Sequence, residues 1–213
     1  ANSVGGDYYA YRWLDKEKTK LSIVVADVSG KAMEAAVTAL RFNEMLRYEC
    51  EGRTEPAEIL DGLNASLEDQ IDLATFITCC VVVLDVSTGE VQVANAGHCP
   101  PVLVKDTAEL IDLNGYPLGL PKIVRPDEPY DTVCFALSPG DRLVLYSDGV
   151  VEAQNARHHL FDDDRFLRLL ERAGAEMTSE DLIQKTVTQV TSFIGDAPRT
   201  DDITMVVLQR EVS

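Results

Sequence analysis

The sequence predicts an α+β fold in which mostly antiparallel sheets are covered by pairs of helices. The first observation is the turn Ser87-Thr88-Gly89, which joins two apolar, strand-like runs and is too short for anything but antiparallel pairing. The second is that helical patterns come in pairs between blocks of strands, which disfavours a parallel sheet with a helix after each strand. A chain of 213 residues can bury a sizeable core, and we expect one domain over residues 1–213.

The first half of the chain begins with a predicted hairpin and a pair of helices. An aromatic-rich strand follows Gly5-Gly6, and a charged turn at residues 15–18 leads into an apolar strand over 21–26. We expect one helix over about 31–51 and a second from about residue 54, with a proline in its first turn. The expected apolar faces are Met33, Ala36, Val37 and Leu40 on the first helix, and Ile59, Leu60, Leu63 and Leu67 on the second.

From residue 75 the apolar pattern changes to that of strands. A long buried strand over 76–86 is expected to return through the tight turn as a strand that includes residues 91–94. Two more helices are predicted, one around residues 166–170 and one that begins with a capping box of Thr178 and Asp181. The remaining predicted strands are 102–104, 132–137, 142–146 and 203–208.

Composition and charge exclude some classes of partner. With 36 Asp and Glu against 19 Lys and Arg, the net charge of -17 repels nucleic acid and anionic membranes, so we expect neither as a partner. No apolar run approaches the roughly 20 residues that cross a bilayer. The five cysteines form no Cys-x-x-Cys pair, which is typical of a reducing, cytoplasmic compartment. Because the chain begins Ala1-Asn2 without methionine, we expect it to be processed or excised from something longer.

Aspartates stand at the ends of several predicted strands. Asp27 ends an apolar strand, where a carboxylate is costly unless it is paired or binds a metal; the alternative is that it caps the next helix. Asp7, Asp148 and either Asp201 or Asp202 share this placement beside glycine or a second polar residue. Carboxylates brought together repel one another unless a cation neutralises them, and oxygen ligands favour Mg²⁺ or Mn²⁺ over Zn²⁺. The alternative is that these are turn aspartates scattered over the surface.

Five motifs that span nearly the whole chain are Val-Gly-Gly-Asp-Tyr-Tyr (4–9), Ala-Asp-Val-Ser-Gly-Lys (26–31), Asn-Ala-Gly-His (95–98), Leu-Tyr-Ser-Asp-Gly-Val-Val-Glu-Ala (145–153) and Asp-Asp-Ile-Thr-Met-Val-Val (201–207). In sequence and in order they closely resemble the motifs of the bacterial PPM-type serine/threonine phosphatases. The resemblance is to the branch of sporulation protein E and RsbU. Five motifs in the family's order are far more specific than any one Asp-Gly pair.

The resemblance implies a four-layer α-β-β-α sandwich, in which helix pairs flank two mostly antiparallel sheets, with two Mn²⁺ or Mg²⁺ ions at one end. It implies hydrolysis of phosphoserine or phosphothreonine on a partner signalling protein, often a STAS-domain anti-anti-sigma factor in a partner-switching pathway. A metal-activated water attacks phosphorus in such enzymes, so no protein nucleophile is expected. Association of two copies as a homodimer is compatible with this interpretation.

The resemblance also assigns roles to individual residues. Asp27 is expected to bridge both ions, and the carbonyl of Val28 to add a further ligand. Asp7 serves the ion pair from the first motif. Asp148 and Asp201 complete the set from the later motifs.

Three departures from the family pattern bear on activity. The family usually has a second aspartate three residues after Asp7, where this chain has Ala10, and a glycine where it has Ala32. The strand that usually precedes the first motif is absent from this sequence, so we expect the C-terminal catalytic part of a longer regulator, with sensor or receiver modules upstream. The alternative function is therefore a catalytically weak or silent PPM-like module that binds a signalling partner. For His98, two roles are open: a general acid, or a residue that orders its own loop.

Overall fold

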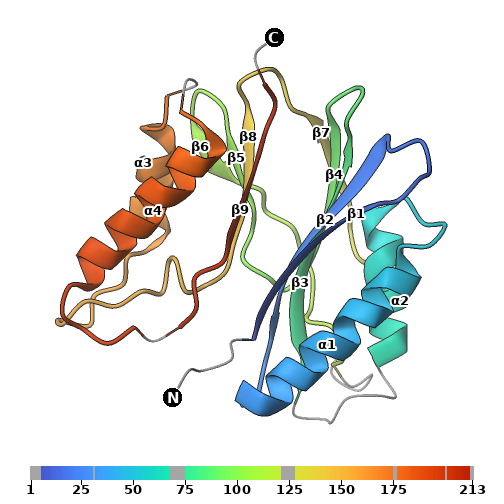
Figure 1. Ribbon diagram of the computed structural model, residues 1–213, viewed down its shortest axis with the longest axis horizontal. Helices are drawn as coiled ribbons and strands as arrows, with labels where there is room; N and C mark the ends of the chain where they lie inside the picture. The colour runs from blue at the N-terminus through green and yellow to red at the C-terminus, as the bar shows by residue number, and fades with distance from the viewer. Residues whose placement is uncertain are drawn as a thin grey trace. The chain divides into compact units, whose positions relative to one another are not determined.

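The computed structural model describes residues 6–30, 32–67, 75–120, 128–174, 177–199 and 201–211. The chain divides into two compact units, unit 1 (Ala1–His98 and Asp112–Ala136) and unit 2 (Cys99–Ile111 and Leu137–Ser213). Each unit has one antiparallel sheet and one pair of helices (Figure 1). The α+β prediction, with mostly antiparallel sheets and paired helices, is confirmed.

Unit 1 is a five-stranded sheet covered on one face by two helices. Its strands follow the order β1-β2-β3-β4-β7, and every neighbouring pair is antiparallel. The strands are β1 (Asp7–Trp13), β2 (Lys20–Val28), β3 (Ile77–Asp85), β4 (Glu90–Ala96) and β7 (Val133–Ala136), and the helices are α1 (Ala32–Glu49) and α2 (Pro56–Leu67). The predicted hairpin is therefore β1–β2.

Unit 2 has a smaller sheet with its own helix pair. Its strands follow the order β6-β5-β8-β9, again with antiparallel neighbours. The oxygen of Thr178 accepts the backbone N–H of Asp181, so the predicted capping box starts the last helix. The elements are β5 (Val102–Val104), β6 (Ala108–Leu110), β8 (Arg142–Tyr146), β9 (Met205–Gln209), α3 (Asp163–Glu171) and α4 (Ser179–Ile194).

The predicted apolar face of α2 is confirmed, whereas that of α1 is wrong. Ile59, Leu60, Leu63 and Leu67 are all buried against the sheet of unit 1. On α1, however, Val37 and Leu40 are 49% and 70% exposed. The buried apolar side chains among the described residues of α1 are instead Ala35, Phe42 and Leu46.

The error on α1 has a physical reason. Its sequence contains two apolar stripes at helical spacing, and the core takes the one with the bulky Phe42 and Leu46, whose burial removes more apolar surface from water. The side chains of Met33 and Ala36, and the motif residues Gly5 and Lys31, lie outside the part of the chain that the structure describes.

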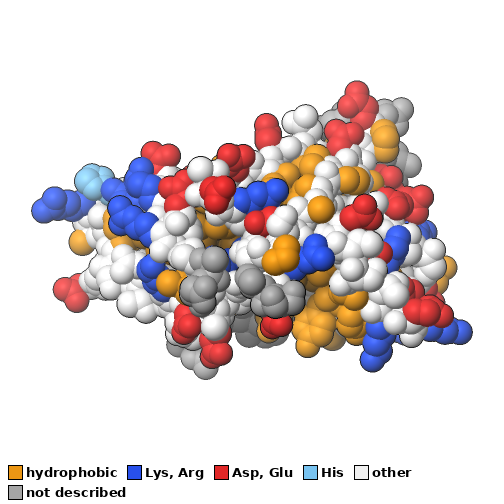
Figure 2. All heavy atoms as spheres, turned by 90° about the horizontal axis from the view of Figure 1, so that it is seen from above, with side chains coloured by type: hydrophobic (Ala, Val, Ile, Leu, Met, Phe, Trp, Pro, Cys, Tyr) orange, Lys and Arg blue, Asp and Glu red, His pale blue; other side chains and the backbone are white. Residues whose placement is uncertain are grey.

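The surface agrees with the acidic composition. Figure 2 shows Asp and Glu side chains scattered over the face it presents, with Lys and Arg among them, rather than gathered into one patch. Within the described residues, no helix has the length and apolar character that a membrane span requires. Each of the five cysteines carries a thiol outside any disulfide.

Arg142 ties the connection between α3 and α4 to the sheet of unit 2. This side chain at the start of β8 is 1% exposed. Its guanidinium donates to the carbonyls of Ala173 at 3.2 Å, Gly174 at 2.9 Å and Met177 at 2.5 Å. A planar guanidinium can serve three carbonyls at once, whereas an ammonium group cannot hold the same fork.

We expect Arg142→Lys to lower the free energy of unfolding by about 3 kcal/mol, because charged hydrogen bonds are lost and the carbonyl of the buried Ala173 is left without its donor. Urea titration followed by circular dichroism measures the loss. The control is Arg41→Lys, the same change at an exposed position of α1. Equal midpoints for the two variants would contradict the role given to Arg142.

Candidate metal centre

The first group of predicted ligands lies where β1 begins and β2 ends. Asp7 stands directly opposite Asp27 in the antiparallel register. The neighbouring pair is hydrogen-bonded, since the N–H of Val28 donates to the carbonyl of Gly6 at 3.1 Å. Hydrogen-bonded and non-hydrogen-bonded pairs alternate, so Asp7 and Asp27 form a non-hydrogen-bonded pair, in which side chains approach most closely. Two partly buried carboxylates therefore share one face of the sheet.

Gly6 makes room for the oxygens of this first group. A Cβ at Gly6 would lie 2.5 Å from the carbonyl oxygen of Val28 and 2.6 Å from Oδ1 of Asp27. Only glycine therefore lets the backbone at position 6 approach these two oxygens so closely. Carboxylate and carbonyl oxygens are the donors that a hard divalent cation prefers. The predicted ligands Asp7, Asp27 and Val28 are therefore brought together in unit 1.

Asp27 is not the cap of α1. It lies within β2, and the helix begins only at Ala32. The chain between them is fixed by Ser29, whose hydroxyl donates to the carbonyl of Phe76 at 2.8 Å and accepts the N–H of Phe76 at 2.8 Å. The capping alternative for Asp27 is therefore wrong.

Thr78 and His98 extend the row of polar residues across the sheet. Thr78 on β3 is the cross-strand partner of Asp27, and its hydroxyl lies 2.9 Å from Nδ1 of His98. The amide of Asn95 donates to the carbonyl of His98 and accepts its N–H, each at 2.9 Å. These contacts are those of a histidine that orders its own loop, one of the two roles expected for it. The sequence alone did not single out Thr78, because it lies inside an apolar run. Its position beside Asp27 follows only from the strand register.

The second group of predicted ligands lies in unit 2, just after β8. The N–H of Ser147 donates to the carbonyl of Thr204 at 3.0 Å, and the hydroxyl of Ser147 accepts the N–H of Thr204 at 3.0 Å. These bonds hold the Asp148-Gly149 turn beside the segment that precedes β9.

Gly149 is in direct backbone contact with that segment. A Cβ at Gly149 would lie 1.8 Å from the carbonyl oxygen of Asp202 and 3.6 Å from Cβ of Asp201. Asp201 is exposed, and its Oδ1 accepts the N–H of Asp202 at 2.8 Å. Asp148 and Asp201 are therefore brought into one neighbourhood within unit 2, with Asp202 supplying the backbone contact.

The electrostatics of unit 2 are those of an anionic site. Burial, together with the charges of Asp148, Asp163 and Glu152, raises the pKa of the Cys99 thiol to about 12. Cys99 therefore stays protonated at neutral pH and is a poor nucleophile.

Each unit holds two of the predicted carboxylates, and their oxygens are the donors that Mg²⁺ and Mn²⁺ prefer. Within the described residues, no three His, Cys, Asp or Glu side chains stand close enough to one another to form a complete metal cage. The donor set of each group fits a divalent cation in the chemistry of its atoms.

Comparison with known proteins adds the family context. The family model described as "Stage II sporulation protein E (SpoIIE)" matches residues 17–211. "Phosphoserine phosphatase RsbU" of Bacillus subtilis (strain 168) is 28% identical over 219 residues, which cover 100% of this chain and 61% of that protein. "Protein IcfG" of Synechocystis is 27% identical over 240 residues, which cover 99% of this chain and 36% of that protein. The chain thus spans less than two thirds of each of these relatives.

Solved structures show the same fold. The SiaA-PP2C domain of Pseudomonas aeruginosa matches with a TM-score of 0.82 at 23% identity, over 98% of this chain and 82% of that one. The RsbU and RsbW domains of a Mycobacterium tuberculosis protein match with a TM-score of 0.82 at 25% identity, over 99% of this chain and 56% of that one. A structure of RsbX in complex with magnesium matches with a TM-score of 0.66 at 15% identity, over 97% of this chain and 87% of that one.

Proposed function

Because the chain belongs to the stage II sporulation protein E family, we propose that it is a metal-dependent phosphatase that removes phosphate from phosphoserine or phosphothreonine of a partner signalling protein. The observation that carries the proposal is the cross-strand pair of Asp7 and Asp27 beside the carbonyl of Val28. The name of RsbU, a phosphoserine phosphatase, supports the choice of substrate.

The proposed ligands are those that the family's motifs imply. Two divalent ions would be held by the carboxylates of Asp7, Asp27, Asp148 and Asp201 and by the carbonyl of Val28. When bound, the ions supply positive charge for the phosphoryl oxygens and activate water for in-line attack. Mg²⁺ and Mn²⁺ are the proposed ions, and the magnesium complex of RsbX supports this choice.

Residues around the proposed ligands position them and leave water as the nucleophile. Gly6 and Gly149 keep the backbone close to the ligands, and no larger side chain fits at either position. Cys99 beside Asp148 stays a neutral thiol, because the pKa of its side chain is raised to about 12, and so it does not compete with water as the nucleophile. Ser147 and Thr204 hold the Asp148 turn in place through their mutual hydrogen bonds.

The position of Ala10 favours an active enzyme over a silent binding module. Ala10 packs against the hydrophobic core of unit 1, on the face of β1 opposite to that of Asp7. An aspartate at this position would point into that core rather than beside Asp27. The departure at Ala10 therefore removes no carboxylate from the face that carries Asp7 and Asp27.

Removal of divalent ions is expected to abolish hydrolysis of p-nitrophenyl phosphate, and added Mn²⁺ to restore it. Asp7 and Asp27 repel each other without a cation, so Mn²⁺ should also stabilise the fold, by about 2.7 kcal/mol at 100 times its dissociation constant. Thermal melts and rate measurements, each with EDTA, Mn²⁺ or Mg²⁺, test both effects. Undiminished hydrolysis in EDTA would contradict the proposed metal centre.

We propose a cytoplasmic STAS-domain protein phosphorylated on serine or threonine as the substrate, and a longer regulator as the full protein. The Mycobacterium tuberculosis structure, in which RsbU and RsbW domains share one chain, supports a partner-switching setting. The test measures phosphate release from a folded phospho-STAS protein in Mn²⁺. Release at a saturable rate supports the proposal, whereas tight binding without release would favour the silent module.

A further inference from the structure

The two helices of unit 2 enclose a groove with a basic rim and an apolar floor. The groove, here called the α3–α4 groove, has a volume of about 410 Å³. Its floor is made by Phe161 and Leu169, which are 5% and 7% exposed. Its rim is made by the cations Arg165, Arg168, Arg172 and Lys185.

The spacing of the cations places them on one helix face. Arg165, Arg168 and Arg172 follow one another at i, i+3 and i+7 on and just after α3, so they lie along the same side of the helix. Lys185 comes from α4 and is half-buried, whereas the three arginines are exposed. Four of the chain's 19 Lys and Arg residues thus gather around one groove in a protein of net charge -17.

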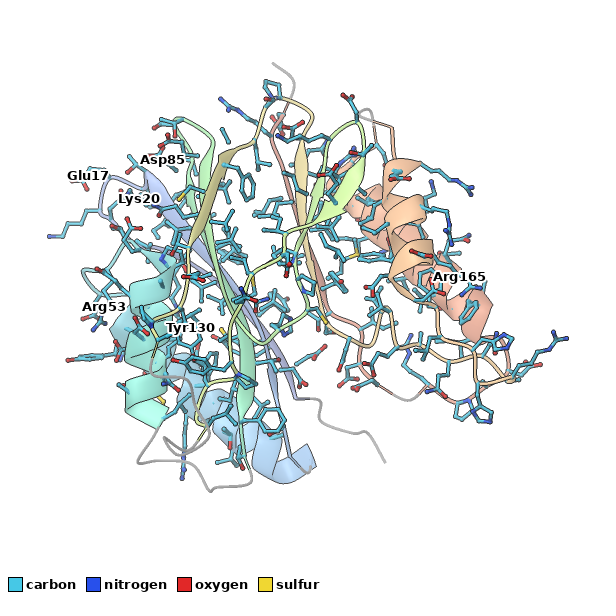
Figure 3. All side chains as sticks on the ribbon, turned by 180° about the vertical axis from the view of Figure 1, so that it is seen from behind. Glu17, Lys20, Arg53, Asp85, Tyr130 and Arg165 are labelled. Atoms are coloured by element: carbon cyan, nitrogen blue, oxygen red, sulfur yellow. The ribbon has the colours of Figure 1, made fainter. Side chains whose placement is uncertain are left out.

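Two of these cations have acidic neighbours in sequence. Arg165 pairs with Asp162 at 2.8 Å, donates to the carbonyls of Leu160 and Phe161, and lies 5.1 Å from the centre of the Phe193 ring. It is a fixed wall of the groove, and Figure 3 labels it on the helix pair of unit 2. Arg168 lies 3.9 Å from the exposed carboxylate of Asp164, a distance at which the pair contributes little.

The other two cations keep their charge available. Throughout the residues that the structure describes, no carboxylate lies within ion-pairing distance of Arg172 or Lys185. The acid one turn before Lys185 on α4 is Asp181, and its carboxylate accepts the hydroxyl of Thr178. The groove therefore presents uncompensated positive charge above an apolar floor.

We propose that the α3–α4 groove binds an acidic, amphipathic segment of a partner protein. Apolar side chains of the segment would cover Phe161 and Leu169, and its Asp and Glu side chains would meet Arg172 and Lys185. The net charge of -17 repels long polyanions such as DNA or an anionic membrane, whereas a short segment brings only a few charges to a local positive site. The inference goes beyond phosphate hydrolysis, because it concerns binding by residues outside the proposed metal centre.

The test uses two fluorescein-labelled 14-residue peptides and fluorescence anisotropy with the whole chain. One peptide carries Leu at helical spacing with Glu between, and its matched control has every Glu replaced by Gln. We expect the acidic peptide to bind at least about tenfold more tightly than the neutral one, since complementary charge at an exposed rim favours the right partner. Equal binding of the two peptides would overturn the proposal.

Variants of the chain locate the binding. We expect Arg172→Glu with Lys185→Glu to lose binding of the acidic peptide at least about tenfold. Lys16→Glu with Arg41→Glu makes the same change in net charge at exposed positions of unit 1, and should stay within about twofold of the unaltered chain. Equal losses in the two double variants would overturn the proposal, because bulk charge would then explain them. Arg172→Gln with Lys185→Gln repeats the test if charge reversal disturbs folding.

Two further measurements separate this inference from others. The first uses a short DNA duplex and phosphatidylglycerol vesicles as competing ligands. If either binds more tightly than the acidic peptide and loses binding in the Arg172→Glu, Lys185→Glu variant, the groove belongs to another class of ligand and the proposal is overturned. Hydrolysis of p-nitrophenyl phosphate should be unchanged in that variant. An inactive chain that still binds the acidic peptide through Arg172 and Lys185 would refute the proposed function and support the groove.

Discussion

Asp27→Asn is expected to lower Mn²⁺-stimulated hydrolysis of p-nitrophenyl phosphate by about a thousandfold or more while the protein stays folded. The substitution keeps the size of the side chain and removes a negative charge that would help to hold the two ions. Loss of one ion's contribution to the transition state costs about 4 kcal/mol, which corresponds to this factor in rate. Asp7, which stands opposite Asp27 in the sheet, is already one of the proposed ligands.

The same substitution separates catalysis from stability. Without metal, Asp27→Asn removes repulsion with Asp7, so the melting temperature should hold or rise slightly. With Mn²⁺, the stabilisation expected of the unaltered chain should be largely lost. The control is Asp112→Asn at an exposed position of unit 1, which should keep both the rate and the response to Mn²⁺. A folded Asp27→Asn variant with near-normal, Mn²⁺-stimulated activity would show that the catalytic centre lies elsewhere.

Gly149→Ala is expected to damage both the stability of unit 2 and the activity. The new methyl group would lie 1.8 Å from the carbonyl oxygen of Asp202 and 2.8 Å from its carbon, so backbone rather than a flexible side chain must move. Overpacking of this kind costs about 1–3 kcal/mol. Because the same shift displaces Asp201 relative to Asp148, we expect hydrolysis to fall by about a hundredfold.

Gly174→Ala is the matched control for this prediction. Gly174 also lies in unit 2, but a Cβ there would meet nothing within 4 Å, and its backbone is not left-handed. Alanine at such a position usually stabilises by a few tenths to 1 kcal/mol. Urea unfolding and Mn²⁺-stimulated rates of both variants decide the matter. Similar behaviour of Gly149→Ala and Gly174→Ala would show that the contact with Asp202 is relaxed in solution.

Much of the fold followed from local pattern, and the errors arose where tertiary packing decides. Hydrophobic periodicity and turn residues predict the order of most strands and helices, the β1–β2 hairpin and the buried face of α2. The buried face of α1 cannot be predicted in this way, because the helix has two apolar stripes and packing against the sheet determines which one is buried. The strand β6 was missed because its sequence, Ala-Glu-Leu, contains none of the β-branched residues that mark the equally short β5, Val-Leu-Val.

Local sequence pattern predicts part of the candidate site, namely the residues that lie on one hairpin. Asp7 and Asp27 could be assigned to one hairpin, and the register then places them side by side. The contact of Thr78 with His98 depends on a register across β3 and the loop after β4, which no local pattern encodes. The α3–α4 groove could not be predicted from the sequence, because three arginines at helical spacing are typical of a solvated helix face and Lys185 belongs to another helix.

The bonds of Arg142 have a consequence for the kinetics of recognition. Because its guanidinium holds the carbonyls of Ala173, Gly174 and Met177, the end of α3 cannot move away from β8 without breaking charged hydrogen bonds that are buried or partly buried. An incoming segment would then meet a groove that is already preorganised, and only the segment would lose conformational entropy. Association should proceed in a single phase whose observed rate constant rises linearly with protein concentration, with no slow isomerisation of the receptor. Loosening the end of α3 through Arg142→Lys should then add a slower phase without removing any charge from the rim.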